Sequence, residues 1–190
     1  GQAVGALCIK EPWPGLATTI LNDQKRFIKT YFSEFKGYYR SGDVAKRDKD
    51  GDYFIAGRMD DVMNVSGHRI GCAEIENALS FHPDIVESSV VSFPHPIKGE
   101  GIYAFLVLRG DVELESETFR IEVLAVVERV IGAIAKPEKI QIVKDLPKTR
   151  SGKIIRRILR RMVAGESFAG EDLTTLTNQG ILAEIQQGII

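Results

Sequence analysis

The sequence contains little cysteine and shows no spacing typical of metal ligands. Cys8 and Cys72 are its only cysteines among 190 residues, too few for a disulfide framework. Buried, reduced thiols are therefore expected, and they predict a cytoplasmic protein. No apolar run approaches the roughly 20 residues that span a bilayer. No charged-then-apolar leader opens the chain, and its first residues instead suit the middle of a β-region, which predicts a fragment of a larger protein.

The chain also lacks an excess of either charge. Its 25 basic and 26 acidic side chains give a formal net charge of −1, whereas nucleic-acid-binding domains usually carry a strong basic excess. Hydrophobic residues make up 44% and charged residues 27% of the sequence, close to the average of folded soluble domains. We therefore expect a folded protein whose partners include neither nucleic acid nor a membrane.

The pattern of apolar residues predicts an α+β fold. Near the beginning, a strand over residues 3–9 and a short helix over residues 22–32 precede a hairpin at Asp48-Lys-Asp-Gly51, a strong turn signal. A calcium loop is the alternative there, but its twelfth position needs glutamate and is Met59. From residue 60 the pattern predicts a small domain with a few-stranded sheet and flanking helices. Its expected elements are a hairpin, a helix over 73–80, strands over 86–93 and 102–108 (the second central), a helix from 116 to 131, a short strand at 140–142 and a last helix.

Two of these helices are predicted in more detail. Ser116 is expected to cap the first, whose inward residues would be Phe119, Val123, Val127, Val130 and Ile131. The last helix is expected from Ser151 to about Val163. Its apolar stripe would consist of Ile154, Ile155, Ile158, Leu159, Met162 and Val163. Lys153 would then stand in the first turn, where a cation opposes the helix dipole, and a locally unfavourable residue often marks a functional site.

Four short segments combine glycine, which lets the backbone approach a ligand closely, with a fixed charge. Asp43 offers two acceptor oxygens for ribose hydroxyls, Arg58 a planar donor fork, and Arg69 a guanidinium for phosphate. Taken singly, each also fits an ordinary turn or a surface salt bridge. The fourth segment is not a Walker A loop, because the leading glycine is missing. The segments are Tyr39-Arg-Ser-Gly-Asp43, Gly57-Arg-Met-Asp-Asp61, Ser66-Gly-His-Arg69 and Leu146-Pro-Lys-Thr-Arg-Ser-Gly-Lys153.

In this order the four segments resemble the motifs of the adenylate-forming superfamily, which contains acyl-CoA synthetases, luciferases and peptide-synthetase adenylation domains. Tyr31-Phe32, Phe93-Pro-His-Pro-Ile-Lys98 and the tail segment 171–176 further resemble AMP-forming acetyl-CoA synthetases. The resemblance implies that residues 1–59 are a mainly β remnant that ends the large adenylate-forming domain, and that residues 60–190 form the mobile C-terminal domain. It also implies that the phosphate loop, adenine site and acyl pocket lie upstream, so that the fragment alone is inactive.

The resemblance implies a ligase that activates acetate with ATP to acetyl-AMP, then transfers the acyl group to CoA and releases AMP. Magnesium is expected with ATP, although no metal ligand is identified in this chain. Lys153 would also be open to reversible acylation by a protein acetyltransferase and a deacetylase. The implied roles are catalysis by Lys153, nucleotide binding by Asp43, Arg58 and Arg69, CoA binding by Ser66 and Gly67, and a hinge at Asp60.

Alternatives remain at this point. Within the superfamily, the chain could belong to a propionyl- or other acyl-CoA synthetase, or to an adenylation domain that feeds a carrier protein. From a different class, a nucleic-acid or protein-binding module would use a basic cluster, although a charged helix face is usually just solvated and nearby acids weaken phosphate binding. That cluster consists of Lys148, Arg150, Lys153, Arg156, Arg157, Arg160 and Arg161. His82 and His95 adjoin prolines and are expected to be turn residues rather than acid–base groups.

Overall fold

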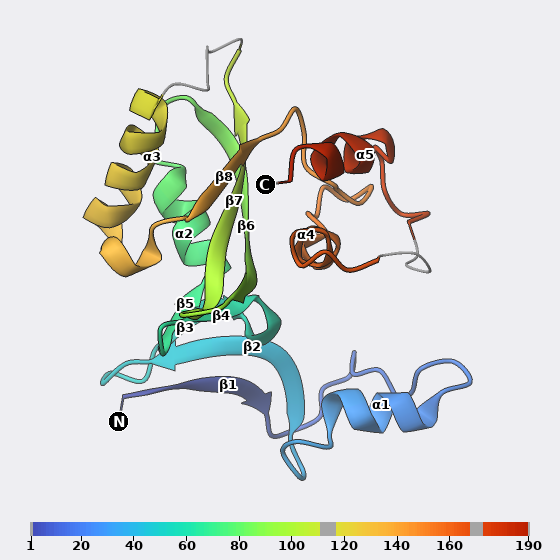
Figure 1. Cartoon of the computed structure of the whole chain (residues 1–190). Coiled ribbons are helices and arrows are strands. Elements are labelled where there is room, and N and C mark those ends of the chain that lie inside the picture. The colour runs from blue at the N-terminus through green and yellow to red at the C-terminus, as the bar shows by residue number, and fades with distance from the viewer. Residues whose placement is uncertain (1, 111–116, 168–172, 190) are drawn as a thin grey trace. The chain divides into compact units, whose positions relative to one another are not determined.

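The computed structural model describes residues 2–110, 117–167 and 173–189 (Figure 1). The chain divides into two compact units, Gly1–Asp61 and Val62–Ile190, called unit 1 and unit 2 below. Each unit combines a sheet with helices, so the predicted α+β class is confirmed. Within the described ranges, no helix has the length and apolar character needed to cross a membrane.

Unit 1 is built on a three-stranded antiparallel sheet. Its strands β1 (Ala3–Ile9), β2 (Tyr39–Arg47) and β3 (Tyr53–Arg58) lie in sequence order. The turn between β2 and β3 is held by Asp48, whose Oδ1 accepts hydrogen bonds of 2.9–3.0 Å from the backbone N–H groups of residues 50–52. The predicted hairpin is thus confirmed. The short 3₁₀ helix η1 (Met59–Asp61) ends the unit.

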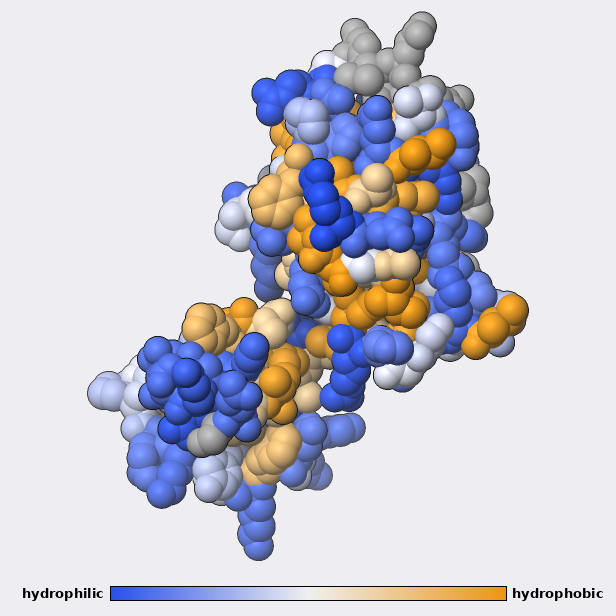
Figure 2. Space-filling model, turned by 90° about the vertical axis from the view of Figure 1, so that its left-hand side faces the viewer, coloured by the Kyte–Doolittle hydropathy of each residue, from blue (hydrophilic) through white to orange (hydrophobic). Residues whose placement is uncertain are grey.

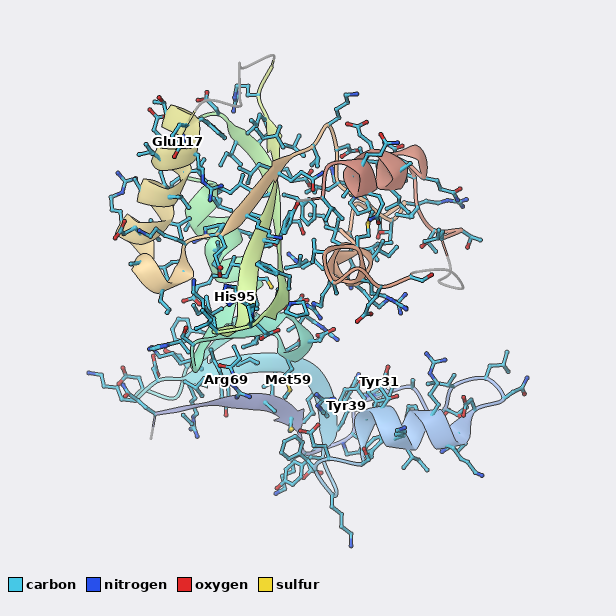
Figure 3. All side chains as sticks on the ribbon, viewed as in Figure 1. Tyr31, Tyr39, Met59, Arg69, His95 and Glu117 are labelled. Carbon is cyan, nitrogen blue, oxygen red and sulfur yellow. The ribbon has the colours of Figure 1, made fainter. Side chains whose placement is uncertain are left out.

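Aromatic rings fasten the helix of unit 1 to the start of β2. The helix α1 (Gln24–Tyr31) is capped by Asp23, which accepts a 3.0 Å hydrogen bond from the backbone N–H of Arg26. Tyr39 of β2 stacks on Tyr31 of α1 with 5.0 Å between ring centroids (Figure 3). Burial is the main cause that raises the pKa of Tyr39, and the neighbouring Tyr31 and Asp43 raise it further. The packing fixes the end of β2 that lies four residues before Asp43.

The sheet of unit 2 is organised around one strand, β7, whose middle residues are buried. Its order is β5-β4-β7-β6, and β8 pairs in parallel with β7. Because β7 is paired with β4, β6 and β8, the predicted central position of residues 102–108 is confirmed. The strands are β4 (Val62–Val65), β5 (His68–Gly71), β6 (Ile85–His95), β7 (Gly99–Leu108) and β8 (Lys139–Ile142).

Helices cover both faces of this sheet (Figure 1). One face carries α2 (Cys72–Leu79) and α3 (Glu117–Val130), followed by the 3₁₀ helix η2 (Ala133–Ala135). The other carries α4 (Arg156–Val163) and α5 (Gly180–Gln187). Successive side chains of a strand point to opposite faces, so β7 supplies both cores. Ile102, Ala104 and Leu106 belong to the core with α2 and α3, whereas Tyr103 and Phe105 belong to the core with α4 and α5.

Two predictions about the helices are wrong. The last helix begins at Arg156, not at Ser151. A positive φ of 80° at Gly152 and a 2.9 Å bond from the Ile155 N–H to the Pro147 carbonyl hold residues 147–155 in a loop instead. Lys153 therefore lies in that loop and opposes no helix dipole.

The second wrong prediction concerns Val130, which was expected to face the core but is 43% exposed. Phe119, Val123 and Val127 are buried at a spacing of four residues. Ile131, four residues after Val127, continues this line and packs against the core. Val130 is the last residue of α3, where a position on the apolar face of a helix does not ensure burial. The predicted cap Ser116 lies outside the described residues.

An ion pair joins the helical layers around the edge of the sheet. Arg156, the first residue of α4, donates from Nε to Oε1 of Glu76 in α2 over 2.9 Å, and its Nη2 donates to the second carboxylate oxygen. Oε1 of Glu76 also accepts a 2.8 Å hydrogen bond from the N–H of Val90. Val90 belongs to β6, the end strand of the order. One carboxylate thus binds the sheet edge and fixes the beginning of α4, three residues after Lys153.

We expect Glu76→Ala to lower the free energy of unfolding of the chain by about 2–3 kcal/mol, because it removes the acceptor of a buried N–H and of a guanidinium together. Denaturant unfolding measures this change. The matched control is Glu74→Ala, an exposed glutamate on the same helix, expected within about 0.5 kcal/mol of the unaltered chain. Equal losses in the two variants would contradict the role given to the Glu76–Arg156 ion pair.

Candidate functional site

The structure brings together three predicted site residues of unit 1. Asp43 of β2 lies opposite Arg58 of β3 in the sheet register, with 3.8 Å between Asp43 Oδ1 and Arg58 Nη1. Arg58 Nε donates a 3.1 Å hydrogen bond to Oδ1 of Asp60. The arginine therefore stands between two carboxylates. Its side chain remains 51% exposed and that of Asp43 31%, so both can still meet a ligand.

The glycine before Asp43 lies within strand β2 rather than in a turn, and both its backbone conformation and the nearby Arg58 favour glycine there. Gly42 has a φ of 85°, a conformation that favours glycine. A Cβ at this position would lie 3.2 Å from Nη2 of Arg58. Ser41 Oγ accepts from the Asp43 N–H over 3.1 Å and donates to the carbonyl of Leu7 over 2.9 Å. The backbone of Asp43 is thus fixed to β1, while its carboxylate offers acceptor oxygens of the kind that ribose hydroxyls need.

The predicted CoA-binding residues form the turn of the β4–β5 hairpin. Ser66 and Gly67 have φ values of 51° and 84°, and two successive positive values are typical of a type I′ hairpin turn. The backbone N–H of Ser66 donates a 3.0 Å hydrogen bond to the carbonyl of Lys98. No heavy atom lies within 4 Å of a Cβ added to Gly67. The turn therefore projects into open space, and exposed Arg69 follows it on β5.

The turn between β6 and β7 supports this hairpin from one side. Nδ1 of His95 accepts hydrogen bonds of 3.1 Å from the N–H groups of Ile97 and Lys98, and its Nε2 lies 3.0 Å from Oε2 of Glu138. Lys98 Nζ lies 3.2 Å from the other oxygen of Glu138. His95 and Arg69 lie in the same part of unit 2 (Figure 3). His95 is itself the last residue of β6 and holds the following turn through its side chain, whereas His82 lies in a turn, as predicted, and accepts from the Asp84 N–H.

Lys153 lies on a short loop, residues 147–155, called the lysine loop below. The Thr149 N–H donates to the Lys153 carbonyl over 2.9 Å, and the Lys153 N–H donates to Thr149 Oγ1 over 3.2 Å. The Gly152 N–H closes the turn on the Thr149 carbonyl at 2.9 Å. The Lys153 side chain itself is exposed and forms no ion pair with any residue that the structure describes. The backbone of this lysine is ordered while its ammonium group remains available.

Lys148, the other lysine of the segment, has the opposite environment. Its Nζ contacts Oε2 of Glu87 and lies 3.0 Å from Oδ1 of Asp145. The hydrogen bond to Glu87 raises the pKa of Lys148 against the opposing effect of partial burial. Partial burial works against ionisation of Asp145, but hydrogen bonds from Lys148 and the Leu146 N–H lower its pKa overall. Lys148 is therefore bound by two carboxylates, whereas Lys153 presents an exposed ammonium group.

Other members of the basic cluster are also compensated by acids. Arg156 is bound by Glu76, and Arg161 Nε lies 3.6 Å from Glu166. This compensation weighs against the alternative of a phosphate-backbone-binding face. Across residues 2–110, 117–167 and 173–189, no group of three or more His, Cys, Asp or Glu side chains is placed to hold a metal ion.

The carboxylates that organise the site escaped the sequence analysis. Glu76 meets a residue 80 positions away, and Glu87 and Lys148 are also distant in sequence. No local spacing signals such pairs, because they arise only when β6 is placed between α2 and α4. The tail after residue 172 was also missed as a structural element, although Ile181, Leu182 and Ile185 have the spacing of a helix face.

Comparison with known proteins agrees with the motifs. Residues 74–153 match the family of the AMP-binding enzyme C-terminal domain. The chain is 52% identical over 188 residues to the acetyl-coenzyme A synthetase of Syntrophus aciditrophicus. This match covers 99% of the chain and 29% of the relative. It is 50% identical over 186 residues to that of Brucella melitensis biotype 1, again over 29% of the relative. The chain thus spans less than a third of the length of these curated relatives.

Solved structures give the same result. The acyl-CoA synthetase of Brucella canis superposes with a TM-score of 0.52 at 41% identity, over 66% of this chain and 23% of that one. The amide bond synthetase McbA of Marinactinospora thermotolerans superposes with a TM-score of 0.69 at 25% identity, over 83% and 30%. Together with the order of the four motifs, these matches show that the chain belongs to the acyl-adenylate-forming superfamily and contains its AMP-binding enzyme C-terminal domain.

Proposed function

We propose that this chain is the C-terminal part of an AMP-forming acetate–CoA ligase. In this proposal the whole enzyme joins acetate to AMP at the expense of ATP, then transfers the acyl group to CoA and releases AMP. The observation that carries it is the contrast between the two lysines of one motif, since Lys148 is bound by carboxylates and Lys153 is exposed on a held loop. The names of the relatives support acetate as the acid, with a propionyl- or other acyl-CoA synthetase as the alternative.

Unit 1 supports the proposal that residues 1–59 end a larger adenylate-forming domain. Tyr53, Phe54 and Ile55 of the end strand β3 are 56–61% exposed, so large apolar side chains emerge on both faces of an edge strand. Figure 2 shows hydrophobic side chains among charged ones on the surface of the molecule. Exposed apolar edge strands are normally covered or paired, and the remaining length of the relatives would supply the cover.

In the first half-reaction, an acetate oxygen attacks the α-phosphorus of ATP. The bond from the α-phosphorus to the oxygen that bridges to the β-phosphate breaks, and pyrophosphate leaves. Magnesium would enter as part of the ATP substrate. Asp43 would accept the ribose hydroxyls, and Arg58 would bind the same nucleotide. Lys153 would place its ammonium group beside the acetate and α-phosphate oxygens, where negative charge increases in the transition state. A fixed cation at that place lowers the barrier because little reorganisation is needed.

In the second half-reaction, the CoA thiol loses its proton to water, its sulfur attacks the carbonyl carbon of acetyl-AMP, and the bond from that carbon to the AMP oxygen breaks. We propose that unit 2 turns about Asp60, as in hinge motions where few residues absorb the backbone change. The open space beside Gly67 would then admit the pantetheine arm of CoA, with Ser66 beside it and Arg69 on phosphate. The Arg58–Asp60 hydrogen bond connects the nucleotide-binding arginine to the hinge residue.

The remaining parts of the enzyme follow from the length of the relatives. The phosphate loop, the adenine site and the acyl pocket would lie in the larger share of the protein, so the isolated chain is proposed to be inactive. A cytoplasmic location agrees with free thiols at Cys8 and Cys72. Exposed Lys153 would be the substrate of a protein acetyltransferase and a deacetylase, since acylation removes the charge that adenylation needs.

Lys153→Ala in the full-length protein tests the function. We expect acetate-dependent ATP–pyrophosphate exchange to fall by about a hundredfold or more, as for other groups that stabilise transition-state charge. Thioester formation from supplied acetyl-AMP should stay within about threefold of the unaltered protein, because unit 2 then acts in its other position. Lys144→Ala, a lysine with a side chain 84% exposed, is the control and should change neither rate. Full exchange activity in Lys153→Ala would refute the assigned role.

Two substitutions at Gly67 separate the turn from the proposed CoA path. Gly67→Ala should destabilise the chain by about 1–2 kcal/mol, the usual cost of a left-handed alanine, whereas Gly67→Asn should cost less because asparagine adopts this conformation. In the full-length protein, Gly67→Asn should raise the KM for CoA about tenfold by filling the open space, with pyrophosphate exchange unchanged. An unaltered KM for CoA would show that this glycine serves the turn alone.

A further inference from the structure

A segment near the end of the chain pairs with the lysine loop. The Arg150 N–H donates a 3.2 Å hydrogen bond to the Thr175 carbonyl, and the Thr177 N–H donates one of 3.0 Å to the Lys148 carbonyl. Between them, Thr149 and Leu176 form an antiparallel bridge. Residues 173–177, which form this single bridge rather than a full β-strand, are called the tail strand below. Main-chain bonds thus join the tail strand to both sides of Thr149, the residue that in turn binds both backbone groups of Lys153.

The tail strand is itself held by the core of unit 2. Leu176 is 6% exposed and belongs to the same core as Leu182 and Ile185 of α5. The buried Gln141 of β8 donates a 2.9 Å hydrogen bond to the Ile185 carbonyl and accepts one of 2.8 Å from the hydroxyl of Tyr103. A path of packed side chains and hydrogen bonds therefore connects the central strand, through α5, to the loop that carries Lys153.

The lysine loop needs this support because its own bonds leave one side open. The Glu87 and Asp145 carboxylates hold Lys148 at its beginning, and the Ile155 N–H bonds to Pro147 at its end. The middle of the loop, from Thr149 to Gly152, contains a turn with a positive φ at Gly152. The tail strand adds its two main-chain bonds on either side of that middle segment. Without them the middle of the loop would retain only the turn bonds between Thr149 and Lys153, with the contacts of Lys148 and Ile155 at its ends.

We propose that the tail strand is a positioning element for Lys153, and that Thr177 is its positioning residue. The region that matches the family's C-terminal domain ends at Lys153, so this support comes from sequence beyond it. The inference rests on the proposed adenylation role of Lys153. A shift of about 1 Å in a reacting group can cost about a hundredfold in rate, so loosening the loop should slow adenylation without affecting the thioester step, in which Lys153 takes no part.

Two substitutions at one position test this proposal. Thr177→Pro removes the N–H donor to Lys148, whereas Thr177→Ala keeps the donor and loses only a hydroxyl whose bond to the Lys148 carbonyl is 3.3 Å long. Both leave Leu176 and the apolar residues of α5 in place. Hydrogen exchange of the Arg150 amide in the 190-residue chain measures the pairing directly. In the full-length protein, pyrophosphate exchange and thioester formation from acetyl-AMP are measured separately.

We expect the Arg150 amide to exchange at least about tenfold faster in Thr177→Pro, with pyrophosphate exchange lowered about tenfold and thioester formation within about twofold. Thr177→Ala should match the unaltered protein in all three measurements. Unchanged pyrophosphate exchange despite a deprotected Arg150 amide would overturn the proposal, and so would equal losses in both half-reactions, which would mark the tail strand as a general stabiliser. If the unaltered protein shows no pyrophosphate exchange, the proposed function fails. The tail-strand contact can still be judged separately, because an Arg150 amide equally protected in both variants would show that Thr177 does not hold the lysine loop.

Discussion

The structure of unit 2 depends on the two-sided burial of β7. Residues 102–106 of this strand are at most 1% exposed, and their alternation gives each face of the sheet its own core. At one end, β7 begins at Gly99, which pairs with Val65 beside the Ser66–Gly67 turn. At the other end, the parallel strand β8 leaves β7 and leads to the lysine loop. The two proposed functional loops are therefore both positioned by one rigid, buried strand, which suits groups that must reach a ligand with small error.

The pairing of cations with carboxylates is the second constraint on unit 2. The lysine loop contains cations at both of its ends and on the helix that follows, and the structure neutralises those that are structural. Lys148 is bound by Glu87 and Asp145, and Arg156 by Glu76. All three carboxylates are partly buried, where unpaired charges cost free energy. Among the described residues of the loop, Lys153 keeps an exposed ammonium group on a backbone that is bonded at several points, and Arg150 is exposed as well. These ion pairs leave fewer cations for a phosphate backbone, which weighs against the alternative of a general phosphate-binding surface.

The fold could be predicted where local pattern decides it. The hairpin at Asp48, the central strand 102–108 and the stripe of α4 follow from turn chemistry and apolar spacing. The start of α4 was misplaced because Ile154 and Ile155 continue the helical stripe, although the positive φ of Gly152 and the bond from Ile155 to Pro147 keep them in a loop. The grouping of Asp43 and Arg58 is a matter of strand register, which the short hairpin turn largely sets.

Contacts between distant residues could not be predicted in this way. Glu76, Glu87 and Thr177 gain their meaning only when the sheet and its two helical layers are assembled, since each binds a partner on another element. Val130 shows the converse, because its apolar character and its position on the helix suggested burial, whereas it is exposed at the last residue of α3. The motifs thus indicated which residues to consider. Packing then distinguishes Lys148, which supports the loop, from Lys153, whose side chain remains exposed.

The most direct test of this account is the chemical reactivity of these two lysines. The full-length protein would be treated with limiting acetic anhydride, with and without acetate and α,β-methylene-ATP, an analogue that cannot release pyrophosphate, and acetylated lysines mapped by mass spectrometry. We predict rapid modification of Lys153 in the free protein and at least about tenfold protection when acetate and the analogue are bound, since contact with the bound anions shields the Lys153 amine from the reagent. Lys148 should react slowly in both states. Equal reactivity of Lys153 with and without the bound ligands would contradict the central claim that this lysine meets the substrate.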